Sequence, residues 1–217
     1  MVLASGDRKM QNIPTGLHIQ MLPDVQSPSS RDRMIEAAID LMRGYGLCGV
    51  GINDVVRQSG APRGSLYHFF PEGKAQIASE ALAVQGERIA AFMDQALSSR
   101  RAAPQKVMAL FEAYAQRVEQ SAFHKSCAIG AVTLDLPADD EPLRLVLAGI
   151  LEGWRGVIAR HFPMSGPKEA QSFAGLVMTA IEGAHIRCRA ERSGTPFREA
   201  GQWLSRLVAQ AASGARK

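Results

Sequence analysis

Apolar residues recur at three- and four-residue steps through most of this chain, which is the spacing of helices that bury one face. We expect helices over about residues 29–45, 52–59, 63–70, 73–98, 105–122, 127–134, 141–162, 168–192 and 195–212. No stretch alternates like a β-strand, and we find no internal repeat or low-complexity tract. The pattern therefore predicts an all-α protein with about nine helices.

Two short helices joined by a tight turn are predicted between residues 49 and 74. Gly60 can take the left-handed backbone conformation that a close helix–helix turn needs. Pro62 suits the first turn of the next helix, where its missing N–H costs nothing. That helix would bury Leu66 together with Phe69, Phe70 or both.

The outward face of the second short helix carries four different polar side chains. Arg63, Ser65, Tyr67 and His68 offer a guanidinium, a hydroxyl, a phenol and an imidazole. A short helix with such a face fits the major groove of DNA, where base edges present hydrogen-bond donors and acceptors. The pattern therefore predicts a helix-turn-helix.

Several runs of residues resemble the tetracycline-repressor-type (TetR) family, in its LmrA/YxaF-like branch. The likeness is strongest between residues 44 and 82 and extends over about residues 30 to 212. The runs that carry it are GAPRGSLYHFFPEGK from Gly60 to Lys74, SCAIGAV from Ser126, IEGA from Ile181 and RAERS from Arg189.

The resemblance implies a division of the chain into three parts. Residues 29–74 would form a three-helix DNA-binding domain with the helix-turn-helix. Residues 75–217 would bind an effector and dimerise, with the long helix after residue 73 linking the two domains. Residues 1–28, which lack a helical period, are expected to form a flexible arm.

The resemblance also implies a set of DNA contacts. Tyr67 and Lys74 would hold phosphate, Arg63, Ser65 and His68 would lie nearest base edges, and Asn53 would touch the opposite backbone. The candidate DNA-binding residues are thus Asn53, Arg63, Gly64, Ser65, Tyr67, His68 and Lys74. Gly51 departs from the family pattern, because Thr or Ser usually caps the second helix there. A hydroxyl cap is typically worth about 1 kcal/mol over alanine, although glycine caps almost as well.

An effector pocket and a homodimer interface are further implications of the resemblance. The pocket would suit a small hydrophobic compound, with Glu182 or His185 as polar anchor. Its candidate lining residues are Phe92, Met93, Phe111, Tyr114, Ile129, Trp154, Met178 and Glu182. The last two helices would pair with their copies, so that two recognition helices read a palindromic operator in double-stranded DNA. Candidate interface residues there are the small Gly175, Ala180, Gly183 and Ala184, the larger Phe173, Leu176, Val177, Ile181 and Cys188 around them, and Phe197, Leu204, Leu207 and Val208 on the last helix.

The composition of the chain is compatible with a DNA-binding regulator but does not by itself indicate one. The chain has 217 residues, 46% of them apolar, and a net charge of +4. Residues 31–74 hold six basic and five acidic side chains, so no basic patch marks the DNA-binding segment. Three widely spaced cysteines argue against a disulfide scaffold and favour the cytoplasm. No signal peptide or membrane span is expected.

Three alternatives remain beside the ligand-responsive regulator. His124 with Cys127 and His185 with Cys188 could form a metal set if both pairs shared one cavity, although neither spacing is a known signature and no metal or cofactor is expected. A cluster of acidic residues at Asp135 and 139–141 suggests an enzyme as a second alternative. This loop has no matching base or nucleophile, however. A helical ligand-binding or interaction protein with a vestigial helix-turn-helix is the more serious rival, and Gly51 favours it slightly.

Overall fold

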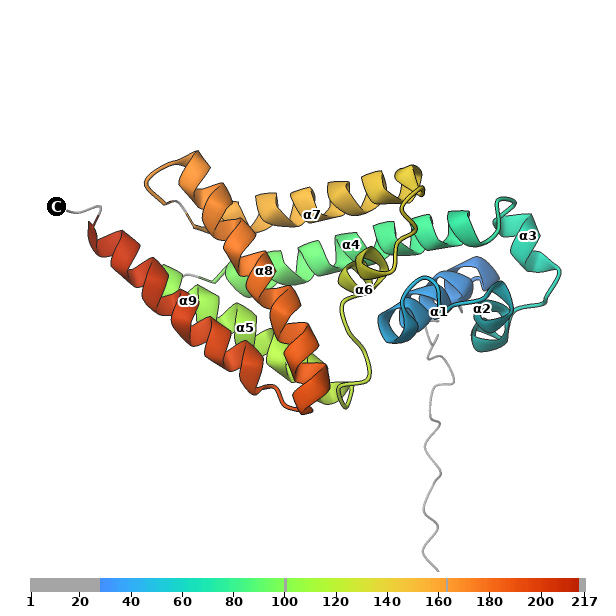
Figure 1. The fold of residues 1–217 in the computed structure, drawn as a ribbon, viewed down its shortest axis with the longest axis horizontal. Helices are drawn as coiled ribbons and strands as arrows, with labels where there is room; N and C mark the ends of the chain where they lie inside the picture. The colour runs from blue at the N-terminus through green and yellow to red at the C-terminus, as the bar shows by residue number, and fades with distance from the viewer. Residues whose placement is uncertain (1–27, 100, 163, 215–217) are drawn as a thin grey trace, which may run out of the picture.

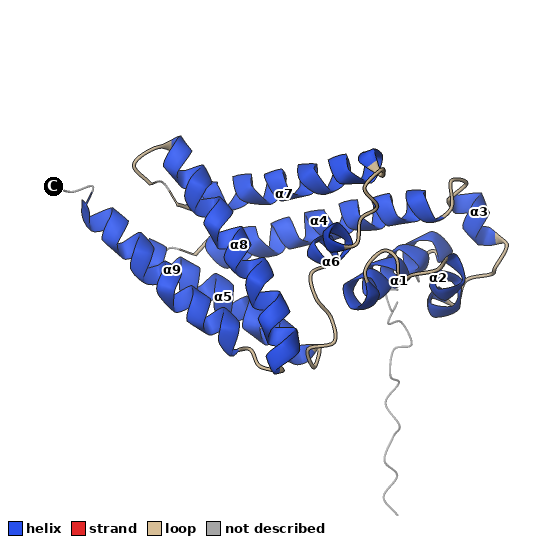
Figure 2. Ribbon diagram, in the orientation of Figure 1, coloured by secondary structure: helices blue, strands red, loops and turns tan. Residues whose placement is uncertain are grey.

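The computed structural model describes residues 28–99, 101–162 and 164–214, and the arm expected before residue 28 lies outside them. Figure 1 shows the helices, and Figure 2 shows helices and loops but no strand in the described ranges, which confirms the all-α prediction. None of these helices is long and apolar enough to span a membrane. The helices are α1 (Ser30–Tyr45), α2 (Ile52–Ser59), α3 (Ser65–Phe69), α4 (Lys74–Leu97), α5 (Ala103–Gln120), α6 (Ala128–Leu134), α7 (Glu141–His161), α8 (Pro167–Glu191) and α9 (Thr195–Gly214).

Helix α1 begins at a capping box. The Asp32 N–H donates to Ser29 Oγ at 3.1 Å, and the Ser29 N–H donates back to the Asp32 carboxylate at 3.3 Å. These bonds satisfy two of the N–H groups that a helix start leaves free. The helix ends at Gly46, whose φ of +69° favours glycine. Its buried face consists of Met34, Ile35, Ala37, Ala38, Ile39 and Met42.

Helices α1 to α3 share a small core with the start of α4. Leu66 and Phe70 are fully buried there, whereas Phe69 is half-buried. The recognition helix is shorter than predicted, since α3 covers Ser65–Phe69 and not residues 63–70. Pro62 lies before the helix, in a turn closed by the Ser65 N–H donating to the Pro62 carbonyl at 3.0 Å.

Helix α4 connects this small core to the rest of the molecule. In Figure 1 it runs from the end of α3 to the region of α5 and α8, with α7 alongside. The Trp154 indole on α7 donates to the Gly86 carbonyl on α4 at 2.8 Å. A Cβ at position 86 would lie 2.9 Å from Ile150, so glycine permits this close approach of α7. The expected long linking helix is present.

Helices α5, α8 and α9 form a second layer of the core. Tyr114 stacks on Phe197 with ring centroids 5.4 Å apart, and His185 meets both rings edge-on. The interface prediction was wrong for the residues that are buried inside the single chain: Phe173, Val177, Ile181, Ala184, Cys188, Phe197, Leu204 and Val208. On α9 this is because α5 covers that side of the helix. We call three exposed large apolar side chains of α8 and α9 the α8–α9 face: Leu176, Trp203 and Leu207.

Candidate nucleic-acid interface and ligand cavity

The turn between α2 and α3 has the geometry of a helix-turn-helix. Gly60 takes the left-handed conformation, with φ of +63° and ψ of 16°, as predicted. At the other end of α2, Gly51 has no side chain to cap the helix. Its own N–H donates to the Asp54 carboxylate at 3.0 Å, which is half of a capping box. The helix start is therefore held in place without the usual hydroxyl.

The candidate base-contacting residues lie together on one exposed surface. Arg63, Gly64 and His68 are exposed, and Tyr67 keeps 62% of its surface. Ser65 is half-buried and donates from its hydroxyl to the Pro62 carbonyl at 2.5 Å. This hydroxyl would have to rotate before it could donate to DNA, whereas the other side chains already face solvent.

Arg63 is joined to α2. Its guanidinium donates to the Asn53 side-chain oxygen at 2.9 Å, and Asn53 is itself exposed near the start of that helix. Only one nitrogen of the fork is used in this bond, so the others remain free to reach a base edge. The bond aligns a base-reading candidate with the predicted backbone contact on the neighbouring helix.

Tyr67 and Lys74 lie on either side of Gly73. A Cβ at position 73 would be 3.6 Å from the Tyr67 ring and 3.4 Å from Ile52, and Gly73 has a φ of +65°. Glycine therefore allows the sharp entry into α4 that places Lys74 at the helix start. The free N–H groups of a helix start attract phosphate, as does the lysine ammonium. The Tyr67 ring therefore lies close to the backbone at the start of α4.

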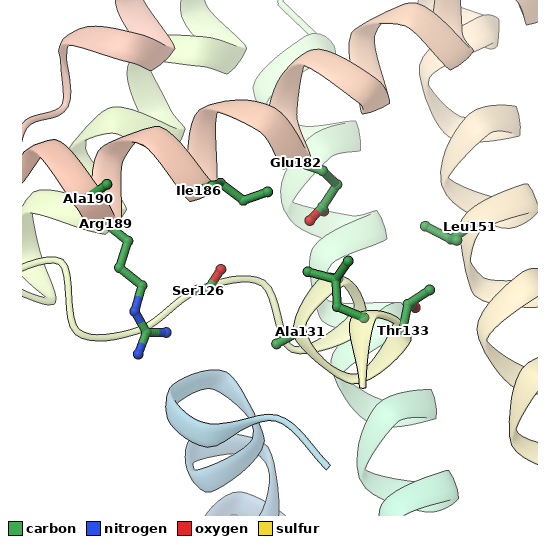
Figure 3. A pocket seen from close by; sticks show the side chains of 10 residues that line it. Ser126, Ala131, Thr133, Leu151, Glu182, Ile186, Arg189 and Ala190 are labelled. Carbon is green, nitrogen blue, oxygen red and sulfur yellow. The ribbon is translucent and has the colours of Figure 1, made fainter. Parts of the chain in front are cut away.

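A cavity of about 540 Å³ opens between α6, α7 and α8 (Figure 3). Its walls are mostly aliphatic, and they carry one acidic and one basic side chain. Figure 3 shows Glu182 and Ile186 reaching in from α8, Leu151 from α7, and Ala131 and Thr133 from α6. The lining residues are Ser126, Gly130, Ala131, Thr133, Leu134, Leu151, Glu182, Ile186, Arg189 and Ala190.

The structure places most of the predicted pocket residues elsewhere. Of those eight residues, Glu182 lines the cavity. Phe92 and Met178 are half-buried against the core, and the others are buried within it: Met93, Phe111, Tyr114, Ile129 and Trp154. They pack against one another because large apolar side chains fill an interior before they surround a void. Whether any of them contacts a ligand stays a prediction.

Glu182 lines the cavity from α8. It also borders a much smaller space of about 20 Å³, whose other polar lining residues are Arg43, Gln85, Tyr114, Arg117, Ser126, Cys127 and His185. Burial raises the pKa of Glu182. A hydrogen bond with Cys127 lowers this pKa, but its effect is smaller. A Cβ at Gly130 would lie 2.2 Å from a Glu182 carboxylate oxygen, so this glycine leaves room for the carboxyl group.

The segment that carries α6 is bonded at both ends to the end of α1. Before α6, the Ser126 N–H donates to the Arg43 carbonyl at 3.0 Å, and the Arg43 guanidinium donates to the Ser126 carbonyl at 3.1 Å. After α6, the Asp135 carboxylate accepts the N–H groups of Leu47 and Cys48 at 3.1 and 2.8 Å. One wall of the cavity is therefore attached directly to the segment that leads into α2.

His185 is a buried histidine with an unusual environment. Its ring meets Tyr114 and Phe197 edge-on, and its Nδ1 has no hydrogen-bond partner among the described residues. Burial, together with the charges of Arg43 and Arg117, lowers the pKa of His185 from 6.5 to about 4. The imidazole is therefore neutral at neutral pH.

This shift predicts that acid destabilises the protein through His185. The unfolded chain takes up a proton near pH 6.5, but the folded one does so only near pH 4, so the native state loses stability as the pH falls through this window. Below pH 4 the free energy of unfolding is lower by about 3 kcal/mol in all, and above pH 7 His185 causes no such decrease. Urea unfolding at several pH values should show a shallower acid loss in His185→Gln than in the wild type.

His124→Gln is the matched control, because His124 is exposed. It should keep the acid sensitivity of the wild type. The comparison uses differences between variants, since the raised pKa of Glu182 acts on stability in the opposite direction. Equal acid losses in wild type and His185→Gln would contradict the prediction.

Several residues behind the alternative interpretations have structural roles. Asp140 caps α7 by accepting the Leu143 N–H at 3.1 Å, and Glu141 pairs with Arg144 at 2.6 Å. Cys188 is buried in the core, whereas His124 is exposed. Within the described ranges, no group of three or more His, Cys, Asp or Glu side chains is arranged to hold a metal ion.

Family models match both parts of the chain. Residues 34–81 match the description "Bacterial regulatory proteins, tetR family", and residues 103–203 match "Transcriptional regulator LmrA/YxaF-like, C-terminal domain". The first range contains the helix-turn-helix, and the second contains the cavity and the first part of α9. The match to the first model reaches into α4, past the proposed domain limit at residue 74.

Relatives and solved structures agree with these matches. An HTH-type transcriptional regulator of Mycobacterium tuberculosis is 32% identical over 174 residues, which cover 77% of this chain and 88% of the relative. The regulator YxaF of Bacillus subtilis is 28% identical, and the alignment covers 77% of this chain and 89% of YxaF. The fold is similar to that of a regulatory protein TetR from Rhodobacter sphaeroides, with a TM-score of 0.74, 22% identity and coverage of 82% and 97% of the two chains. The chain therefore belongs to the TetR family of bacterial transcriptional regulators, in its LmrA/YxaF-like branch.

Proposed function

We propose that this regulator is a homodimeric repressor that leaves its operator when a small hydrophobic ligand enters the cavity between α6, α7 and α8. The observation that carries the proposal is the double attachment of α6, a wall of that cavity, to the end of α1. The proposal places the protein in the cytoplasm, where it reaches a palindromic operator in double-stranded DNA.

The DNA side of the proposal rests on the exposed surface of α3. Tyr67 and His68 project from α3 and Arg63 from the turn before it, and the buried Leu66 and Phe70 hold this segment in place. One such helix reads only a few base pairs, so a two-fold pair of them is needed to read an operator. Residues 29–74 thus act as the DNA-binding unit in this proposal.

The dimer rests on the α8–α9 face. Trp203 and Leu176 are 68% and 45% exposed in the single chain. Apolar side chains of this size, gathered on two neighbouring helices, favour burial against another surface. A second copy presents the same face, and two helix pairs would then form a four-helix interface.

The release mechanism is a shift between arrangements of the dimer. A ligand that fills the cavity binds more tightly when α6 is displaced. Because the α6 segment is hydrogen-bonded to the end of α1, this ligand also stabilises a shifted position of α1. The recognition helices then sit at a separation that does not match the operator, and DNA affinity falls by the ligand's differential binding energy. Helix α4 carries the same displacement, because its first turns pack beside α1 and α2.

Two substitutions separate base reading from backbone binding. Arg63→Ala should cost about 1–3 kcal/mol of operator affinity and relax the sequence preference at one base pair, because a guanidinium reads guanine through two bonds. Lys74→Ala should weaken binding to all sequences alike and reduce the salt slope by about one. Fluorescence anisotropy with single-base operator variants at several salt concentrations measures both effects. Identical salt slopes and an unchanged sequence preference in both variants would count against this division.

Footprinting tests the function as a whole. The purified protein should protect a palindromic segment in the DNA that flanks its own coding region, and a subset of a small hydrophobic compound library should remove the protection. Compound binding without any sequence-selective DNA retention would instead support the ligand-binding protein with a vestigial helix-turn-helix.

A further inference from the structure

The cavity holds a carboxyl group that has no positive partner. Glu182 reaches in from α8, and no basic side chain among the described residues forms an ion pair with it. Its hydrogen-bond partner is the Cys127 thiol, a neutral group whose pKa is raised well above its usual value by burial. A carboxylate in a mostly aliphatic cavity costs free energy unless a positive charge compensates it.

The nearby cations are engaged elsewhere. Arg189 lines the cavity but points away from Glu182 in Figure 3, and its guanidinium donates to the Gly44 carbonyl at 3.0 Å. Arg43 donates to the Ser126 carbonyl, and the Arg117 guanidinium lies 4.6 Å from the centre of the Phe92 ring. His185 is neutral at neutral pH. Among the described residues, none of these cations therefore pairs with Glu182, and its ionised form has no positive partner.

The remaining walls indicate the shape of the partner. The ten lining residues include no aromatic side chain, so neither ring stacking nor a cation–π contact is available to the ligand. Leu134, Leu151, Ile186 and Ala190 offer aliphatic surface around a volume of about 540 Å³. Such walls accept a compact apolar body, and Glu182 is the group that can fix its orientation.

We propose that the cavity binds lipophilic amines, with an aliphatic body against α6, α7 and α8 and a protonated nitrogen paired with Glu182. This inference rests on the proposed function, because it names the chemical class of the releasing ligand. Gly130 is part of the same site, since a side chain there would displace the carboxyl group from its position over α6. The bound ammonium replaces the missing positive partner of Glu182.

Three probes of one shape test the charge preference. Adamantylmethylamine is protonated at neutral pH, adamantylmethanol is neutral, and adamantanecarboxylate is negative. Isothermal titration calorimetry on the full-length protein should give an affinity for the amine about tenfold higher than for the alcohol, with the carboxylate weakest. Glu182→Gln should lose this preference while still binding the alcohol, which shows that the variant remains folded.

Glu191→Gln is the matched control. Glu191 is on the same helix, is exposed and pairs with Arg187 outside the cavity, so this variant should keep the wild-type order. A wild-type protein that binds none of the probes, or the alcohol as tightly as the amine, overturns the inference. So does a Glu182→Gln variant that retains the preference for the amine.

Operator binding separates the two proposals. If the amine binds through Glu182 but leaves DNA affinity unchanged, the site is correct and the proposed release mechanism is wrong. If uncharged or acidic library compounds release the operator and amines do not, the regulator function stands and the amine site is wrong.

Discussion

Replacing Trp203 with glutamate is expected to leave the protein monomeric and to lower its operator affinity about a hundredfold or more. Trp203 is 68% exposed in the single chain, and the Arg206 guanidinium lies 4.8 Å from the centre of its ring. In the proposed dimer this indole is buried, and buried aromatic anchors dominate interface energies. A glutamate at both copies would place two negative charges in an apolar contact.

The loss of operator affinity follows from the way in which a dimer binds a palindrome. Two linked recognition helices bind a palindrome far more tightly than one, because the second contact is made at a high effective concentration. Losing the dimer therefore costs much more than losing any single base contact. Sedimentation velocity at micromolar concentration and anisotropy titrations with the operator measure the two effects separately.

Leu145→Glu provides the control for Trp203→Glu. Leu145 is 57% exposed on α7, outside the α8–α9 face, so the same change of side chain should leave the dimer and the operator affinity as in the wild type. A dimeric Trp203→Glu protein with normal operator affinity would refute the α8–α9 face as the interface. Thermal unfolding shows whether each variant remains folded.

The helical fold was predictable because its signals are local. The capping box at Ser29, the glycine turn at Gly60 and the period of apolar residues each act over a few neighbouring positions. The recognition helix was misjudged at its start for the same reason. Pro62 is compatible both with a first helical turn and with the turn before a helix, and only the bond from Ser65 decides between them.

The cavity was less predictable because a void has no sequence signal. An apolar stripe marks the side chains that leave water, but it does not distinguish those that meet each other from those that border an empty space. Phe111 and Trp154, which were predicted to line a pocket, are buried in the core. Ser126, Ile186 and Arg189 line the cavity but were not predicted, since each is compatible with an ordinary surface position. Glu182 was predicted as a polar anchor from the family resemblance, and it lines the cavity.

The predicted interface included residues that are buried inside the single chain. Phe197, Leu204 and Val208 follow the helical period of α9, and so does its exposed side with Trp203 and Leu207. A helix that is apolar on two sides has two partners, and the sequence does not tell which side meets its own chain. The position of α5 settles this point.

Asp135→Ala is expected to lower the free energy of unfolding by about 4 kcal/mol and to abolish the effect of ligand on operator affinity. The carboxylate accepts the N–H groups of Leu47 and Cys48, and each hydrogen bond to a charged group contributes about 1.5–3 kcal/mol. Asp135→Asn keeps one acceptor oxygen and should lose about half as much. Urea unfolding with the two variants measures this part of the prediction.

The coupling part needs a second measurement. A compound that releases the wild type should still bind to Asp135→Asn, because Asp135 does not line the cavity. Operator affinity with and without that compound gives the coupling free energy, which we expect to fall towards zero. Asp139→Ala is the control, since no side-chain hydrogen bond of Asp139 is found among the described residues, and it should retain wild-type stability and coupling.

These outcomes decide which element transmits the signal. Both α4 and the segment around α6 connect the cavity side of the molecule to the helix-turn-helix, but only the α6 segment passes through Asp135 to the residues just before α2. If Asp135→Asn binds the compound and still releases DNA normally, α4 alone carries the displacement. If the compound no longer releases the operator although the variant still binds the compound and the operator, the bonds from Asp135 to Leu47 and Cys48 couple the cavity to the helix-turn-helix.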